Sequence, residues 1–157
     1  MNSNRPVTYS GRKVLTPSWR AAALVGAGMM AAVDEIVFHQ ILQWHHFYDR
    51  GTPALGLLAD GLLHALELMA IAGGGCMLLA LARRHALHGR AAWSGLLSGA
   101  GAFQLFDGIV VHKLLRLHQV RYGVDLFWYD LTWCLSGLLL LLAGLWLLAR
   151  AKRVQGR

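Results

Sequence analysis

Four long apolar runs constrain this chain more than any other feature of its sequence. They cover residues 21–46, 55–82, 92–117 and 126–149. Each is longer than the ~20 residues that a helix needs to cross the hydrocarbon core of a bilayer. The last run contains LSGLLLLLAGLWLLA, which has no polar face to turn toward water. The sequence therefore predicts an all-α integral membrane protein, a bundle of four transmembrane helices, rather than a soluble helical bundle.

The composition supports the same fold class. Hydrophobic residues make up 56% of the sequence and charged residues only 15%, whereas soluble domains usually have about 25% charged residues. The net charge of +7 is explained by membrane topology and contact with lipid headgroups. It does not indicate binding to nucleic acid, because no basic patch is interleaved with aromatic residues on a soluble element.

The basic residues are distributed unevenly among the segments outside the runs. Most lie in the N-terminal tail, in the loop between the second and third runs, and in the C-terminal tail: Arg5, Arg12, Lys13, Arg20, Arg83, Arg84, Arg90, Arg150, Lys152, Arg153 and Arg157. With four spans these three segments share one side, and the positive-inside rule makes both termini cytoplasmic. We expect a cytoplasmic tail over 1–20, a four-helix domain over 21–150 and a second cytoplasmic tail over 151–157.

An internal repeat is visible in the sequence. Residues 34–45 read DEIVFHQILQWH and residues 107–118 read DGIVVHKLLRLH, which agree at Asp, Ile, Val, His, Leu and His without a gap. The runs that follow align more loosely through DGLLH and DLTWC. The pattern predicts two tandem helical hairpins, 21–82 and 92–149, related as parallel repeats by an axis along the membrane normal.

Ionisable and metal-ligating side chains occur in all four runs at a similar depth. A rise of ~1.5 Å per residue from the cytoplasmic ends places them in the outer half of the membrane. They are Asp34, His39, His45, Asp60, His64, Glu67, Asp107, His112, His118, Asp130 and Cys134. On an ideal helix Asp34 and His45 share a face, but His39 lies about 140° away from Asp34. Either His39 faces a different neighbour or a π-bulge realigns it, so a site must form between helices.

These residue types predict a metal site. Histidines together with Asp, Glu or Cys on facing helices hold metal ions in helix bundles. Imidazole suits zinc, copper, iron and nickel, and Cys134 would favour the softer ions. We expect a transition metal, copper or zinc, bound by His39, His64 and His112, with the other residues of the set as further ligands or as groups that orient them. Its role would be metal handling or that of a redox cofactor, and the sequence does not decide whether a reaction is catalysed.

Other functions fit the same residues. Haem b could take His39 and His112 as axial ligands, although the many carboxyl groups suit an apolar haem pocket poorly. A proton or ion path could run through the Asp and His cluster. Interhelical hydrogen bonds alone, at about 0.6 kcal/mol each on average, are too weak to explain so many costly groups.

Three segments carry a family resemblance: DEIVFHQILQWHH, LLADGLLHALEL and LFDGIVVHKLLRLHQVRYG. They resemble a family of small bacterial predicted membrane proteins known only as a domain of unknown function, over Ala21 to Trp146. The resemblance implies a bacterial inner-membrane protein, and genes of this type look like neighbours of those for copper-linked respiratory assembly factors. It therefore favours copper, and it suggests respiratory or copper-handling membrane proteins as partners in addition to the lipid bilayer. The family supplies no activity, and an oligomer is compatible with the sequence.

Overall fold

The computed structural model describes residues 11–155, so Arg5 and Arg157 lie outside the described residues. Within that range the chain is entirely helical apart from short loops. The elements are α1 (Gly11–Asp34), η1 (Glu35–Ile41), α2 (Pro53–Arg83), α3 (Gly89–Leu105), η2 (Phe106–Leu115) and α4 (Leu126–Gln155), where η denotes a π-helix.

Four helical segments are long and apolar enough to cross a membrane. They are Leu15–Ile41, Pro53–Arg83, Gly89–Leu115 and Leu126–Val154. The first and third of them each combine an α-helix with the π-helix that continues it. This confirms an all-helical chain with four long apolar helices.

The first and third helices end earlier than the apolar runs suggest. Gln43 and Arg116 adopt a left-handed backbone conformation, with φ of 51° and 52°. L-residues seldom adopt this conformation, and it is a common way to end a helix. His45 and His118 therefore lie on loops, and the prediction that Asp34 and His45 share one helix face is wrong.

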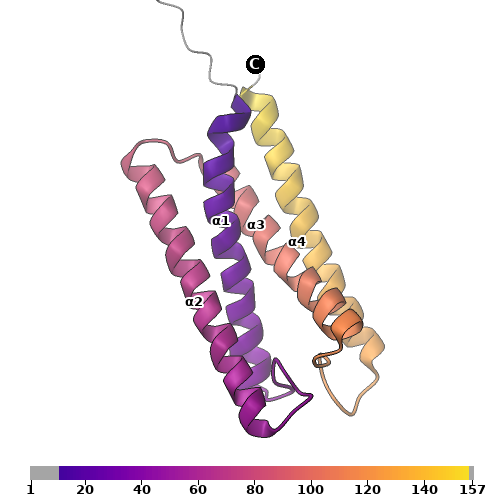
Figure 1. The fold of residues 1–157 in the computed structure, drawn as a ribbon. Helices are drawn as coiled ribbons and strands as arrows, with labels where there is room; N and C mark the ends of the chain where they lie inside the picture. Colours follow the sequence, from indigo (N-terminus) through magenta and orange to yellow (C-terminus); the bar gives the residue numbers. More distant parts are fainter. Residues whose placement is uncertain (1–10, 156–157) are drawn as a thin grey trace, which may run out of the picture.

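The helices stand in a row rather than in a closed bundle (Figure 1). α1 and α3 pack against each other in the middle, α2 packs on the outer side of α1, and α4 packs on the outer side of α3. The start of α1 and the end of α4 lie together at one end of the molecule, where Leu15, Ala91 and Ala151 form a buried apolar cluster. The loops 42–52 and 116–125 lie at the other end (Figure 1).

Glycines allow the close approach of α1 and α3. A Cβ atom added at Gly95 would overlap the backbone of Trp19, and one added at Gly99 would overlap the backbone of Ala23. Gly26 of α1 lies equally close to the backbone of Leu96. Small residues at such positions let membrane helices pack backbone to backbone. The short distance between α1 and α3 therefore depends on the absence of side chains at these glycines as well as on apolar contact.

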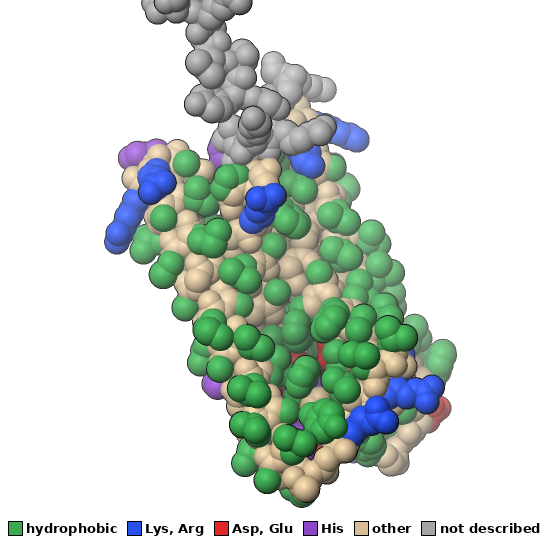
Figure 2. Space-filling model, in the orientation of Figure 1, with side chains coloured by type: hydrophobic (Ala, Val, Ile, Leu, Met, Phe, Trp, Pro, Cys, Tyr) green, Lys and Arg blue, Asp and Glu red, His purple; other side chains and the backbone are tan. Residues whose placement is uncertain are grey.

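The outer surface is apolar between two charged ends. Leu58, Leu62 and Leu66 of α2 are each more than half exposed, at 57%, 60% and 60%. Hydrophobic side chains cover the visible long face, while lysines and arginines gather at both ends (Figure 2). This distribution matches a bilayer around the middle of the molecule and water at its ends.

The central contact can be tested with a glycine variant. Gly99→Val should destabilise the fold by about 1–3 kcal/mol, because the new side chain forces α1 and α3 apart. Gly73→Val is the matched control, since an added Cβ at Gly73 meets nothing within 4 Å. Thermal unfolding in detergent, followed by circular dichroism, measures both. Equal transition temperatures for the two variants would contradict the close α1–α3 contact.

Candidate metal centre

The two π-helices realign the Asp and His pairs that the sequence places five residues apart. Hydrogen bonding from residue i to i+5 widens the turn, so that residues five apart become neighbours. In η1, Nε2 of His39 lies 3.7 Å from Oδ2 of Asp34. In η2, Nε2 of His112 lies 2.9 Å from Oδ2 of Asp107. All four side chains are buried. Of the two alternatives for His39, the π-helical one is therefore observed.

The two loops cross-link each other through histidines. His45 donates its Nδ1–H to the carbonyl oxygen of Val120 at 2.9 Å. His118 donates its Nδ1–H to the carbonyl oxygen of Phe47, also at 2.9 Å. A carbonyl oxygen only accepts, so each neutral ring carries its proton on Nδ1 and presents an unprotonated Nε2. The two rings stack, with centroids 4.4 Å apart and planes inclined by 8°.

Both loop histidines are neutral at physiological pH. Burial lowers the pKa of His45 to about 2, and the adjacent His118 adds to the effect. Burial lowers the pKa of His118 to about 4, while the nearby Asp107 acts in the opposite direction. A neutral imidazole is the form that binds a metal ion, so neither ring must lose a proton first.

His39 is oriented by carboxylates rather than by a carbonyl. Its Nδ1 lies 2.7 Å from Oε2 of Glu35 and 3.2 Å from Oδ1 of Asp60. Its Nε2 forms no hydrogen bond within residues 11–155. A histidine held in this way by a carboxylate on one nitrogen typically binds a metal through the other.

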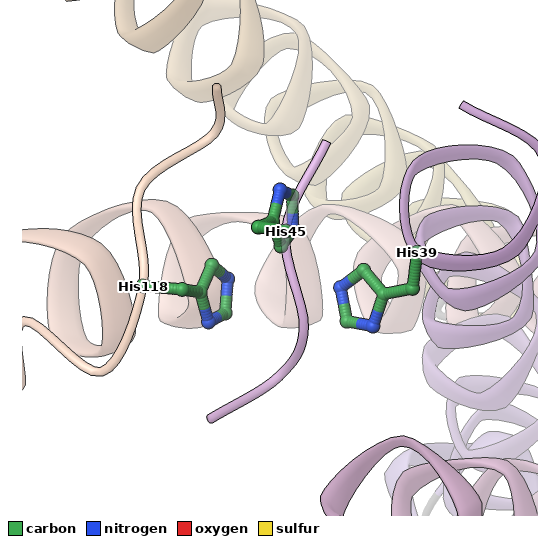
Figure 3. A group of neighbouring side chains, drawn as sticks. All are labelled: His39, His45 and His118. Atoms are coloured by element: carbon green, nitrogen blue, oxygen red, sulfur yellow. The ribbon is translucent and has the colours of Figure 1, made fainter. Parts of the chain in front are cut away.

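Three of these histidines converge on one point. His39, His45 and His118 each offer a ring nitrogen, and the three nitrogens lie within 4.8 Å of one another. Figure 3 shows His39 on its helical segment and the other two on loops, with the three rings around a common space. Since each Nδ1 has an acceptor, Nε2 of His39 and of His45 remains for a ligand, while Nε2 of His118 also lies 2.9 Å from Nε2 of His112. Three imidazoles whose Nδ1 atoms are each held by an acceptor are a typical donor set for zinc or copper.

A fourth histidine joins them. Nε2 of His112 lies 2.9 Å from Nε2 of His118, and Asp107, His112 and His118 form a second group whose ligand atoms lie within 4.8 Å of one another. The indole N–H of Trp133 donates to Oδ2 of Asp107 at 3.1 Å. Because His118 has only Nε2 left, it can serve one ion at a time. We therefore treat His39, His45, His112 and His118 as one histidine cluster.

Asp60 ties the first loop to α2 and to the histidine cluster. Its Oδ1 accepts the backbone N–H of Phe47 at 2.7 Å, and its Oδ2 lies 2.6 Å from Nδ1 of His46. Glu35, His39 and Asp60 are themselves a third group that could hold an ion. Because both carboxyl groups share the one Nδ1 of His39, their arrangement suits orientation of that ring.

Four residues of the predicted site lie apart from the cluster: His64, Glu67, Asp130 and Cys134. The side chain of His64 is 49% exposed, and its Nδ1 lies 2.6 Å from Oε1 of the buried Glu67. Asp130 pairs with Lys113 near the surface. Cys134 is half-buried on α4. None of these four residues belongs to the three groups described above.

Two side chains of the site were not predicted. Glu35 is buried at 1% exposure and contacts His39 at the i,i+4 spacing of helical neighbours, which was a readable signal. His46 contacts Asp60. The repeat obscured both, because the second copy has Gly108 and Gln119 at these places.

Comparison with protein families places most of the chain in a known family. The model of the family described as Predicted membrane protein (DUF2243) matches residues 21–151. The chain belongs to this family. The match confirms the resemblance that the three quoted segments carry, and with the four candidate spans it makes this DUF2243 chain a multi-pass membrane protein. No curated protein and no solved structure is significantly similar to it.

Asp60 provides a test of the site in the DUF2243 chain without any ligand. Asp60→Asn should loosen the 42–52 loop, because Nδ1 of His46 loses its charged partner and Nδ1 of His39 keeps only Glu35. The loss of such hydrogen bonds amounts to about 1–3 kcal/mol, so amide exchange in the loop should accelerate roughly tenfold or more. Hydrogen–deuterium exchange measures this. Asp125→Asn is the control, since Asp125 is exposed in the loop 116–125 and its carboxylate accepts the backbone N–H of Phe127 on α4. Unchanged exchange at Phe47 would contradict the role of Asp60.

Proposed function

We propose that this chain holds a transition-metal ion, copper or zinc, in the histidine cluster, for metal handling or as a redox cofactor of the cell envelope. The observation that carries the proposal is the convergence of His39, His45 and His118, each with its Nδ1 held by an acceptor. Nε2 of His39 and of His45 forms no hydrogen bond within the described chain. Buried polar atoms without partners are costly, and a metal ion would satisfy both.

The surrounding charges also favour a cation. Asp34, Glu35, Asp60 and Asp107 are all at most 2% exposed. Buried carboxylates need a compensating positive charge or dense hydrogen bonding. Oδ2 of Asp34 and Oδ1 of Asp107 form no hydrogen bond among residues 11–155, and each lies 3.7 Å from an Nε2 atom of the histidine cluster. Either carboxylate is therefore a candidate to complete the coordination.

The distances between the ligand nitrogens are close to those found around one bound ion. Nitrogens on one tetrahedral zinc at ~2.0–2.1 Å lie about 3.3 Å from one another. The pair His112–His118 is somewhat closer than this, at 2.9 Å, and the group His39, His45 and His118 lies within 4.8 Å. Small rotations of side chains would bring them to one distance. The donors are imidazoles and carboxylates without a thiolate, which suits zinc or Cu(II) better than Cu(I).

The geometry favours an ion over haem. Four carboxyl groups are buried around these histidines, those of Asp34, Glu35, Asp60 and Asp107. A haem pocket is instead apolar around its axial ligands, so this lining suits a cation better than a porphyrin. Haem b with His39 and His112 as axial ligands is therefore not the function we propose.

The geometry also favours a bound ion over a transmembrane relay. Among residues 15–154, the ionisable groups that are buried all lie at the loop end or just below it, down to Glu67. Toward the other end the buried polar residues are Ser18, Ser94 and Ser98, and Ser94 donates to the backbone of Gly144. Serine hydroxyls so dispersed do not form the chain of acids and histidines that proton relays use.

We also propose that the two hairpins, 21–82 and 92–149, are tandem repeats. Corresponding positions share special features: η1 and η2, the left-handed Gln43 and Arg116, and the reciprocal bonds of His45 and His118 to the opposite loop. These support one ancestral hairpin used twice. The four-helix domain would span 21–150 in a bacterial inner membrane, with the tails 1–20 and 151–157 in the cytoplasm. Partners would be respiratory or copper-handling membrane proteins.

Metal analysis of the purified protein tests the function. The wild type should contain stoichiometric copper or zinc, and a His39→Ala, His112→Ala double variant should lose it. His64→Ala is the matched control, because His64 is half exposed and contacts Glu67 rather than the cluster. An absorption spectrum run alongside would reveal haem by a Soret band. A metal-free wild type after incubation with either ion, or a double variant with full metal content, would sink the proposal.

The topology has a separate test in a variant without Cys76 and Cys134. Thr52→Cys, in the loop beside the cluster, should react in intact cells with a membrane-impermeant maleimide, because the positive-inside rule places that loop outside. His85→Cys, in the loop between α2 and α3, should react only after the cells are permeabilised. The reverse pattern would invert the proposed orientation.

A further inference from the structure

An aromatic cavity lies beside the histidine cluster, between η1, α3 and α4. Its volume is about 440 Å³, within the roughly 300–1,000 Å³ of small-molecule sites. Its aromatic walls are Phe38, Trp44, Trp128, Tyr129 and Trp133. Its polar residues are Gln104, Thr132 and Ser136. Trp128 is 65% exposed on α4, so the cavity opens toward the lipid-facing side of the molecule.

The aromatic rings are packed against one another. The ring of Phe38 lies 5.3 Å from that of Trp44 and 5.4 Å from that of Trp133, the latter edge to face. The rings of Trp44 and Tyr129 are 5.7 Å apart, again edge to face. Arg121 donates to the hydroxyl of Tyr129 at 2.7 Å and lies over the ring of Trp44. These contacts hold the walls in place, so a planar guest would meet a preformed aromatic surface.

One of the residues that line this cavity, Gln104, has a buried polar atom without a partner among the described residues. Gln104 is 4% exposed, and its Nε2 donates to Oγ of Ser136 at 2.8 Å. The hydroxyl of Ser136 donates to the carbonyl of Thr132 at 2.7 Å, so Ser136 can only accept from Gln104. This fixes the amide orientation and leaves Oε1 of Gln104 as an acceptor without a hydrogen bond among the described residues. A ligand that satisfies it must bring a donor.

We infer that this cavity binds a membrane-soluble aromatic alcohol of the hydroquinone class, whose ring packs among the aromatic walls and whose hydroxyl donates to Gln104. The oxidised quinone carries only carbonyl acceptors and leaves Oε1 of Gln104 unsatisfied, so it binds more weakly. A lipid chain fills apolar volume but has neither a ring nor a donor. The ligand is therefore recognised by two features together, its ring and its O–H group.

The inference goes beyond the metal site and does not depend on it. Trp133 forms the shared wall: its ring lines the cavity, and its N–H donates to Asp107 of the metal centre. The other residues that recognise the ligand, Gln104 and Ser136, belong to no group of candidate metal ligands. The binding site can therefore be measured on protein treated with a chelator, whatever the cluster holds.

Calorimetric titration of the chelator-treated, full-length protein in detergent tests the inference. The probe is a decyl-tailed benzohydroquinone under anaerobic conditions, compared with its quinone and with its bis-methyl ether. The hydroquinone should bind saturably, and the ether about tenfold more weakly, the effect of one lost hydrogen bond. Gln104→Leu should lower the affinity for the hydroquinone to that for the ether. Phe103→Leu, one residue away on the wall of a different cavity, should leave it unchanged.

A second variant guards against a folding defect in Gln104→Leu. Ser136→Ala removes the acceptor that holds Nε2 of Gln104, so the amide can turn and donate. The preference should then shift from the hydroquinone toward the quinone. Absence of saturable binding, equal affinity for hydroquinone and ether, or an unchanged preference in Ser136→Ala would each overturn the inference. Equal affinity would identify the cavity as a groove for lipid chains.

Discussion

The reciprocal hydrogen bonds between the two loops are the interaction on which the rest of the polar centre depends. His45 reaches the backbone of the second loop at Val120, and His118 reaches the backbone of the first loop at Phe47. These bonds join the two loops at the end of the helical row, together with a backbone hydrogen bond from the N–H of Asp49 to the carbonyl of Leu117. They also set which nitrogen of each ring is free. The chemistry of the centre therefore follows from how the loops are held.

The close contact of α1 and α3 brings the two loops near enough to form these hydrogen bonds. Gly95 and Gly99 let the two backbones touch, so η1 and η2, which continue these helices, come to lie side by side. With α2 and α4 on the outside, the row exposes apolar side chains, and a cavity lies on each side of the central pair. The aromatic cavity is one of these two. The packing of small residues thus positions both candidate sites.

The two candidate sites are chemically different neighbours. The histidine cluster combines imidazoles with carboxyl groups and suits a hard or borderline cation, whereas the aromatic cavity is apolar with one fixed acceptor. Trp133 contacts both, through its ring on one side and its N–H on the other. A membrane-soluble ligand in the cavity would lie one side chain from the metal centre. The membrane would therefore supply the ligand of the aromatic cavity, whereas the histidine cluster lies at the loop end of the molecule.

The apolar runs by themselves determined the helical membrane fold, because no other structure satisfies the backbone of such long segments in lipid. The repeated D-x-I-V-x-H pattern identified His39, His112 and both aspartates, since charged groups are rare at such depth without a role. The helix periodicity could not place His45 and His118, because loops with left-handed residues end the helices first. Nor could it exclude His64, which has the right depth but the wrong face. Which side chains meet was decided only by the tertiary structure. The glycine contact of α1 with α3 and the backbone carbonyls that orient the loop histidines join residues distant in sequence, which no local pattern reveals.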